Sequence, residues 1–170
     1  MKSVLKVAGI GALLIAFQAI LAPLTLIPSL AIPMPYVLFW LTLPFSWEGR
    51  LSLMAAFIYG IILDIFFPPH GLQTLCGLWV WAVRRLWLRI LNPQLSPDSE
   101  KAFSLSSLER GEFFAYVFPL TAWHHLWYLF LARWTIDGNG LIYFTLSTIY
   151  TFVWEWIIFE LVLRTTNARA

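Results

Sequence analysis

Long apolar runs, separated by short polar or proline-containing segments, dominate the chain. At 1.5 Å per residue, a helix needs about 20 apolar residues to cross the ~30 Å hydrocarbon core of a bilayer, and most of the runs approach that length. The pattern therefore predicts an all-α polytopic membrane protein with six transmembrane helices in a single domain over residues 1–170. The predicted spans cover residues 4–22, 34–46, 51–67, 71–91, 113–133 and 141–163, with a cytoplasmic loop over residues 92–112.

Prolines shape the second predicted span and the connection before it. Four prolines lie between residues 23 and 35, and proline lacks the N–H group that a regular helix requires. We expect this stretch to be a short external connection at the membrane interface. The second span is short, and Pro44 limits its inner end. We therefore expect it to be tilted or irregular.

Composition supports a membrane protein and excludes several other classes. The chain is 60% hydrophobic and 12% charged, whereas soluble domains carry about 25% charged residues. Its 170 residues leave no room for a large catalytic domain outside the membrane, and a net charge of +2 gives no indication of nucleic-acid binding. The single cysteine, Cys76, lies inside an apolar run and is expected to be a packing residue.

Positive charges indicate the orientation. With the amino terminus inside, all but one of the eleven lysines and arginines fall on the inner side of the six predicted spans, the exception being Arg133. Cytoplasmic loops are enriched in Lys and Arg. The distribution therefore predicts that both termini are cytoplasmic.

One helical face in the third span combines small residues with an acid. Ala56, Gly60 and Asp64 recur every four residues, which places them on one side of a helix, and Gly71 opens the next span after a Pro-Pro break. Small residues let another helix approach closely. We expect these four residues to form a partner-contact face. For Asp64 a second role is equally possible, namely capping the helix that starts at Gly71 or reaching outer water.

A second set of polar residues lies inside the predicted spans. Glu155 continues a stripe with Ser147 and Thr151, and it lies at about the same depth as Arg84 and Arg85. Because an unpaired charge in a membrane is costly, we expect an ion pair between Glu155 and one of these arginines that orients spans four and six. The alternative is that span four ends early and its arginines reach anionic lipid headgroups.

The adjacent residues His124 and His125 are expected to form hydrogen bonds inside the bundle, and we group His124 with Arg84, Arg85 and Glu155 as a structural polar network. Neighbours on a helix point about 100° apart, so the two histidines do not favour a shared metal ion. The sequence contains no HExxH zinc motif, GxSxG elbow or nucleotide-binding loop. We therefore predict no catalytic, metal or cofactor site.

Several motifs resemble the MreD family of bacterial rod-shape membrane proteins. They are GIILD (60–64) with Gly71-Leu72, the approach PYVLFWLTLPF (35–45), the basic end of span four, GEFFAY (111–116) and the histidine pair. The resemblance implies a non-enzymatic scaffold of the peptidoglycan-elongation complex, or elongasome, in the bacterial inner (plasma) membrane, where it supports the cell wall and cell shape. It implies binding to the single-helix protein MreC, in a complex with MreB, RodA and a class B penicillin-binding transpeptidase.

The same resemblance implies a fold similar to the substrate-binding subunits of energy-coupling-factor transporters. Such a vitamin-binding subunit is the alternative function, and it would require a ligand-sized pocket lined by aromatic and a few polar groups and open to the outer side. A secondary transporter would be expected to show inverted repeats and helices broken at mid-membrane. No repeat is visible in the sequence.

Overall fold

The chain folds into an all-α structure, which confirms the predicted fold class. The computed structural model describes residues 2–25, 31–47, 49–94, 96–133 and 137–163. Within them lie seven α-helices and three short helical turns. In chain order these are α1 (Lys2–Thr25), η1 (Pro35–Val37), α2 (Leu38–Thr42), α3 (Gly49–Phe66), α4 (Leu72–Leu91), α5 (Pro97–Ala102), η2 (Leu105–Ser107), α6 (Arg110–Arg133), α7 (Gly138–Ile158) and η3 (Phe159–Leu163).

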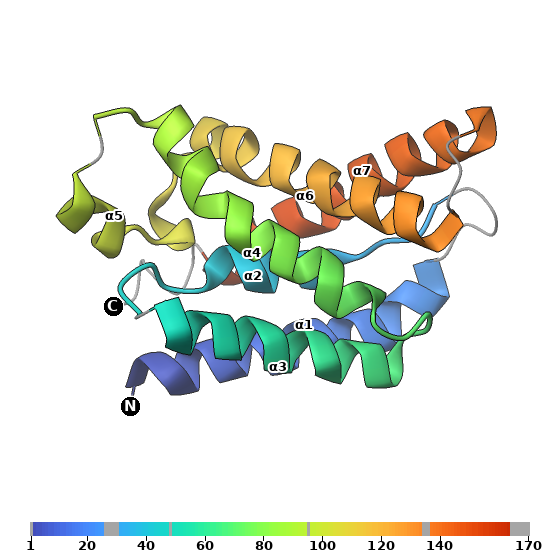
Figure 1. Cartoon of the computed structure of the whole chain (residues 1–170), viewed down its shortest axis with the longest axis horizontal. Coiled ribbons are helices and arrows are strands. Elements are labelled where there is room, and N and C mark those ends of the chain that lie inside the picture. Colours follow the sequence, from blue (N-terminus) through green and yellow to red (C-terminus); the bar gives the residue numbers. More distant parts are fainter. Residues whose placement is uncertain (1, 26–30, 48, 95, 134–136, 164–170) are drawn as a thin grey trace.

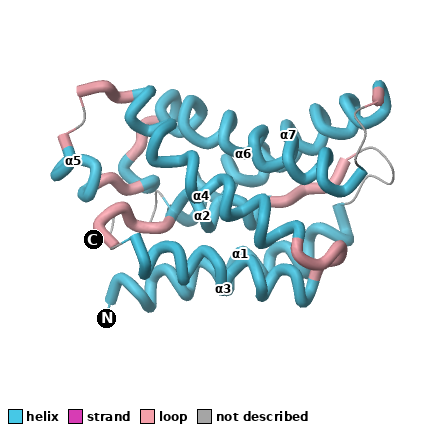
Figure 2. The backbone as a smooth tube through the Cα atoms, in the orientation of Figure 1, coloured by secondary structure: helices cyan, strands magenta, loops and turns pink. Residues whose placement is uncertain are grey.

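The long helices run roughly along one axis (Figure 1). α1 and α3 lie along one edge of the molecule, α6 and α7 lie along the opposite edge, and α4 passes between them, packing against both α3 and α6. The short helix α2 lies in the middle of the bundle, next to α4 and α1. Figure 2 shows how loops connect the helices at the two ends of the bundle.

Successive long helices alternate between the two ends. α1 and α3 begin at the end of the molecule where α4 finishes and α6 begins, and α5 extends from the same end (Figure 1). Basic residues mark this end: Arg50 follows the first residue of α3, Arg89 lies in the last turn of α4, and Arg110 opens α6. The carboxyl-terminal arginines Arg164 and Arg169, which the predicted orientation also uses, lie outside the described residues.

The helix bounds agree closely with the ranges that the apolar pattern predicts for spans one and three to six. Two of the described helical stretches, Gly49–Phe66 and Gly138–Val162, are long and apolar enough to cross a membrane, and Val4–Ile20 is a shorter apolar stretch. Core helices of soluble proteins meet the same criteria. The predicted loop 92–112 contains the short elements α5 and η2.

The proline-rich connection differs from its prediction. Residues 26–30 lie outside the described part, but Ala31 and Met34 are each only 2% exposed. The backbone N–H groups of Ile32 and Met34 donate to the hydroxyls of Ser147 (3.0 Å) and Thr151 (2.9 Å) on α7. Residues 31–34 are thus not helical, in keeping with the prolines. They enter the bundle instead of lying at its surface, because α7 supplies the partners that helical bonds would have provided.

The second predicted span is irregular, as expected, and forms the centre of the core. Residues 36–41 in η1 and α2 are at most 4% exposed. Trp40 lies against α4 at Gly77, where a Cβ atom would come within 2.0 Å of the indole ring. Its Nε1 donates to the Ala56 carbonyl on α3 at 3.2 Å. Glycine at position 77 is therefore what lets the largest core side chain fit beside α4.

A proline inside α6 creates a link to α4. Pro119 has no N–H, so the Ala115 carbonyl four residues earlier lacks its helical donor. The indole Nε1 of Trp87 on α4 donates to this carbonyl at 3.1 Å. This bond supplies the Ala115 carbonyl with the donor that Pro119 lacks, and it links α4 to α6.

Candidate functional site

The face of α3 that carries Ala56, Gly60 and Asp64 packs against α4 of the same chain. Ala56 is fully buried and Asp64 is 8% exposed. A Cβ atom on Gly60 would lie 2.6 Å from the Cα atom of Thr74, so the two backbones touch at this point. The expectation that a helix approaches this face closely is therefore confirmed, and the helix is α4.

Asp64 caps the amino terminus of α4. Its Oδ1 accepts from the backbone N–H of Gln73 at 2.9 Å, and its Oδ2 accepts from the N–H of Thr74 at 3.0 Å and from the Thr74 hydroxyl. Gly71, in the left-handed conformation with φ of 91°, gives α4 no side-chain cap of its own. The carboxylate thus satisfies two N–H groups that helix geometry leaves free. Of the two roles considered for Asp64, capping is confirmed.

The predicted partner-contact face needs a correction. Gly60 is covered by α4, and Ala56 is fully buried with its carbonyl bonded to Trp40 of α2, so the small residues serve contacts within the chain. Asp64 and Gly71 instead lie at the end of an outward groove between α3 and α4. The groove has a volume of about 750 Å³ and is lined by the side chains or backbone of Phe57, Ile61, Asp64, Ile65, His70, Gly71, Thr74, Leu75 and Leu78.

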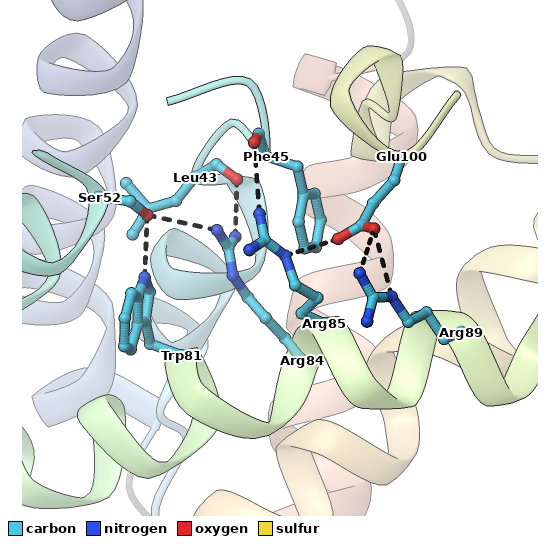
Figure 3. Close-up of polar contacts among 8 residues, drawn as sticks. All are labelled: Leu43, Phe45, Ser52, Trp81, Arg84, Arg85, Arg89 and Glu100. Atoms are coloured by element: carbon cyan, nitrogen blue, oxygen red, sulfur yellow. Dashed lines mark hydrogen bonds and ion pairs between the residues drawn. The ribbon is translucent and has the colours of Figure 1, made fainter. Parts of the chain in front are cut away.

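Arg84 is held at the carboxyl end of α2 (Figure 3). It is 3% exposed. Its Nη1 donates to the Leu43 carbonyl at 2.6 Å, as Figure 3 shows, and to the Trp40 carbonyl at 2.7 Å. The guanidinium also lies 4.4 Å from the centre of the Phe45 ring and 3.5 Å from Ser52 Oγ. A cation is favourable at a helix carboxyl terminus, where carbonyl groups lack helical donors. Arg84 therefore anchors α2 to α4.

Arg85 and Arg89 share one carboxylate, that of Glu100 on α5. Arg85 Nε lies 2.5 Å from Glu100 Oε1, and Arg89 Nη2 lies 3.0 Å from Glu100 Oε2. Glu100 is buried, while 49% of the Arg85 side chain and 58% of the Arg89 side chain are exposed. Figure 3 shows the carboxylate between the two arginines. The contact holds α5 against the end of α4.

The predicted ion pair between Glu155 and Arg84 or Arg85 is wrong. Glu155 is fully buried between α7 and α6, where its Oε2 accepts from the Thr121 hydroxyl at 2.7 Å and its Oε1 has no hydrogen-bond partner. Both arginines point instead to α2 and α5. The prediction used only the depth of each residue along its helix. The side chains point in different directions, so Glu155 faces α6 while the two arginines face α2 and α5.

His124 and His125 on α6 are both buried, but they contact different groups. His125 contacts the Thr121 carbonyl through Nδ1 (2.9 Å) and the Thr151 hydroxyl through Nε2 (3.1 Å), as the prediction of a hydrogen-bonding histidine requires. The prediction is wrong for His124, which is fully buried with no hydrogen-bond partner for either ring nitrogen, so the predicted polar network with Arg84, Arg85 and Glu155 does not form. Its ring packs against Tyr36 and Trp40, with centroids 5.8 and 6.0 Å away. Among the described residues, no group of three or more His, Cys, Asp or Glu side chains could hold a metal ion.

Several residues of these networks were missed by the sequence analysis. Gln73 accepts a hydrogen bond from the Tyr36 hydroxyl, Ser52 accepts from Trp81 Nε1 at 2.9 Å, and Glu100 joins α5 to α4. Ser52 lies between two leucines, and Gln73 forms a polar pair with Thr74 at the start of an apolar run, which is a usable signal. Glu100 lies among other charges and carries no such signal.

Comparisons with known proteins identify no relative. No protein-family model matches the chain, and neither a curated protein nor a solved structure matches it significantly.

Proposed function

We propose that the chain is a six-span membrane scaffold of the MreD kind, with both termini in the cytoplasm and no catalytic activity. Apolar side chains lie on the outside of the bundle and several polar ones lie inside it. Exposed Leu, Ile, Val or Phe side chains occur on each of α1, α3, α4, α6 and α7. Charged and polar side chains are buried inside, among them Arg84, His124 and Glu155. This arrangement suits a hydrocarbon solvent, in which polar groups must face protein.

The positions of the basic residues support this orientation. The basic end of α4 and the starts of α1, α3 and α6 lie together at one end of the bundle (Figure 1). In a bacterial inner membrane this end would face the cytoplasm. The segment 31–42 then fills one of the six crossings as an irregular stretch enclosed by protein, a setting in which a membrane tolerates such backbone.

The observation that carries the scaffold function is the outward groove between α3 and α4. Phe57, Ile61 and Ile65 form one apolar ridge at intervals of four residues, and Leu75 and Leu78 form the facing ridge. Two ridges of this spacing accept the side chains of a third helix. The single transmembrane helix of MreC is the proposed occupant, and MreB, RodA and a class B penicillin-binding transpeptidase are the proposed wider complex.

The vitamin-binding alternative receives less support from the packing of the core. The aromatic rings of Tyr36, Trp40 and His124 fill the space between α2, α4 and α6, and all three residues are at most 1% exposed. A substrate-binding subunit would need ligand-sized room of the kind these rings occupy.

The test is an affinity purification of the tagged chain from native membranes in mild detergent, with mass spectrometry of the captured proteins. Ile61→Trp fills the groove, whereas the control Leu86→Trp changes a side chain of α4 that is 61% exposed and lies outside the groove. We expect MreC and the wall-elongation enzymes with the natural chain and the control, and their loss with Ile61→Trp. Recovery of ATPase subunits and a bound vitamin would overturn the scaffold function in favour of the transporter.

A further inference from the structure

A small pocket lies at the basic end of the bundle, between the turn after α2, the start of α3 and the end of α4. It has a volume of about 130 Å³, and its lining includes Ser52, Trp81, Arg84 and Arg85. The Ser52 hydroxyl and the two guanidinium groups give the pocket hydrogen-bond donors, while Trp81 supplies an apolar wall. A water molecule occupies about 30 Å³ of liquid, so the pocket has room for a group of several heavy atoms.

The charge of the pocket is positive. Arg84 makes its described contacts with neutral groups: two carbonyls, a hydroxyl and an aromatic ring. Arg85 and Arg89 share the single carboxylate of Glu100, which is outside the pocket lining. Three arginines against one carboxylate leave an excess of positive charge among these described residues. Arginine forks match phosphate geometry well, so the pocket favours a phosphate group.

An apolar groove begins beside this pocket. It lies between α1 and α3, has a volume of about 390 Å³, and is lined on α1 from Val4 to Ile15 and on α3 from Leu51 to Ile62. At 1.5 Å per residue both walls extend about 16 Å. That length is close to half of a hydrocarbon core of about 30 Å. The groove therefore matches the depth of one leaflet on the side of the basic end.

Trp47 belongs to the lining of both the pocket and the groove. A molecule with a phosphate head and a hydrocarbon tail could pass this side chain and occupy both at once. Indole rings favour such positions at the level of lipid headgroups. A free phosphate ion would not use the apolar groove, and a lipid without a phosphate group would not use the arginines. Among phospholipids, the excess positive charge favours one with a net negative charge over a zwitterionic one.

We propose that the chain binds one anionic glycerophospholipid of the inner leaflet, with its phosphate against Arg84 and Arg85 and an acyl chain between α1 and α3. The proposal rests on the membrane location put forward above, but it does not depend on which protein partner occupies the groove between α3 and α4. Basic pockets at the cytoplasmic ends of membrane helices are suited to such headgroups.

The test measures the unfolding temperature of the full chain, purified in dodecyl maltoside, against added phosphatidylglycerol, phosphatidylcholine or inorganic phosphate. We expect phosphatidylglycerol to raise the unfolding temperature by several degrees. Phosphatidylcholine should raise it less, because its choline group cancels the charge of its phosphate, and inorganic phosphate should have little effect. Arg85→Gln should weaken phosphatidylglycerol binding about fivefold or more. Its control is Arg89→Gln, because Arg89 also pairs with Glu100 but does not line the pocket.

A second pair of variants tests the groove. Ala12→Phe fills it, whereas the neighbouring Leu13, 46% exposed, lies outside the lining, so Leu13→Phe is the matched control. We expect only Ala12→Phe to reduce phosphatidylglycerol binding. Equal effects of the two lipids, an equal effect of inorganic phosphate, or unchanged binding in Arg85→Gln or Ala12→Phe would overturn the proposal.

The two proposals can fail separately. Lipid binding is measured on the purified chain alone, whereas the scaffold function is measured by the proteins captured from membranes. Lipid binding without MreC would leave the lipid site standing and overturn the scaffold function. Capture of MreC by a chain that shows no lipid preference would support the scaffold function and overturn the lipid site.

Discussion

Gly60 of α3 lies directly against Thr74 of α4, with space for a hydrogen atom but not for a methyl group: a Cβ atom would be 2.6 Å from Thr74 Cα. The atom it would meet belongs to the backbone and cannot rotate away. We therefore expect Gly60→Ala to push α3 and α4 apart and to cost about 1–3 kcal/mol of unfolding free energy.

Gly9 provides the control for this prediction. It lies in α1, and a Cβ atom there would meet nothing within 4 Å. Gly9→Ala should be neutral or stabilising by up to about 1 kcal/mol, because alanine favours the helix. Thermal unfolding of both variants in detergent checks the pair, and equal stability of the two would contradict the close contact.

Asp64 gives a prediction about the start of α4. Asp64→Ala removes the acceptors of the Gln73 and Thr74 N–H groups, so we expect a loss of about 1–2 kcal/mol, typical of a lost helix cap. Asp64→Asn keeps one acceptor oxygen and should lose less. Hydrogen exchange of the first turn of α4 measures the effect locally, and unchanged protection in Asp64→Ala would contradict the capping role.

Arg84 is predicted to be needed for its donors more than for its charge. Arg84→Met leaves the Trp40 and Leu43 carbonyls buried without a partner, at about 1–3 kcal/mol for each group. Lysine keeps the charge but lacks the planar fork, so Arg84→Lys should recover only part of the stability. Full recovery with lysine, measured by thermal unfolding, would show that charge alone is sufficient.

The bond between Thr121 and Glu155 links α6 to α7. Thr121→Val replaces the hydroxyl by a methyl group of similar size and leaves the buried carboxyl group of Glu155 without its donor. We expect a cost of about 1–3 kcal/mol. Thr145→Val is the matched control, because the Thr145 hydroxyl is exposed and donates to the Leu141 carbonyl of its own helix.

Glu100 is predicted to control the mobility of α5. Glu100→Gln removes the charge that Arg85 and Arg89 share, so α5 should detach more often from α4. Limited proteolysis between residues 92 and 109 should then become faster, while Glu109→Gln, in an exposed position of the same segment, should cleave at the natural rate. Equal rates for both variants would mean that the shared carboxylate does not hold α5.

The parts of the fold that follow from local pattern could be predicted from the sequence. Helix bounds follow from apolar length, and the close approach of another helix follows from the spacing of Ala56, Gly60 and Asp64. That this helix is α4 of the same chain could not be predicted from the spacing. The partner of Glu155 could not be predicted, because depth along a helix does not specify which neighbour a side chain faces. Arg84 faces α2 and Glu155 faces Thr121 of α6. The buried position of residues 31–34 could not be predicted either, because it depends on hydroxyls more than 110 positions later in the chain.

The dependence of residues 31–34 on the hydroxyls of α7 also affects the order in which the chain can fold during synthesis. Met34 leaves the ribosome 117 residues before Thr151, the residue whose hydroxyl accepts its N–H bond. At 5–20 residues per second, on the order of ten seconds separate the two. During that interval the segment before α2 has no native partner on α7. The centre of the bundle therefore closes last, although its residues are made early, and a chain that stops before α7 would keep an unfinished interior.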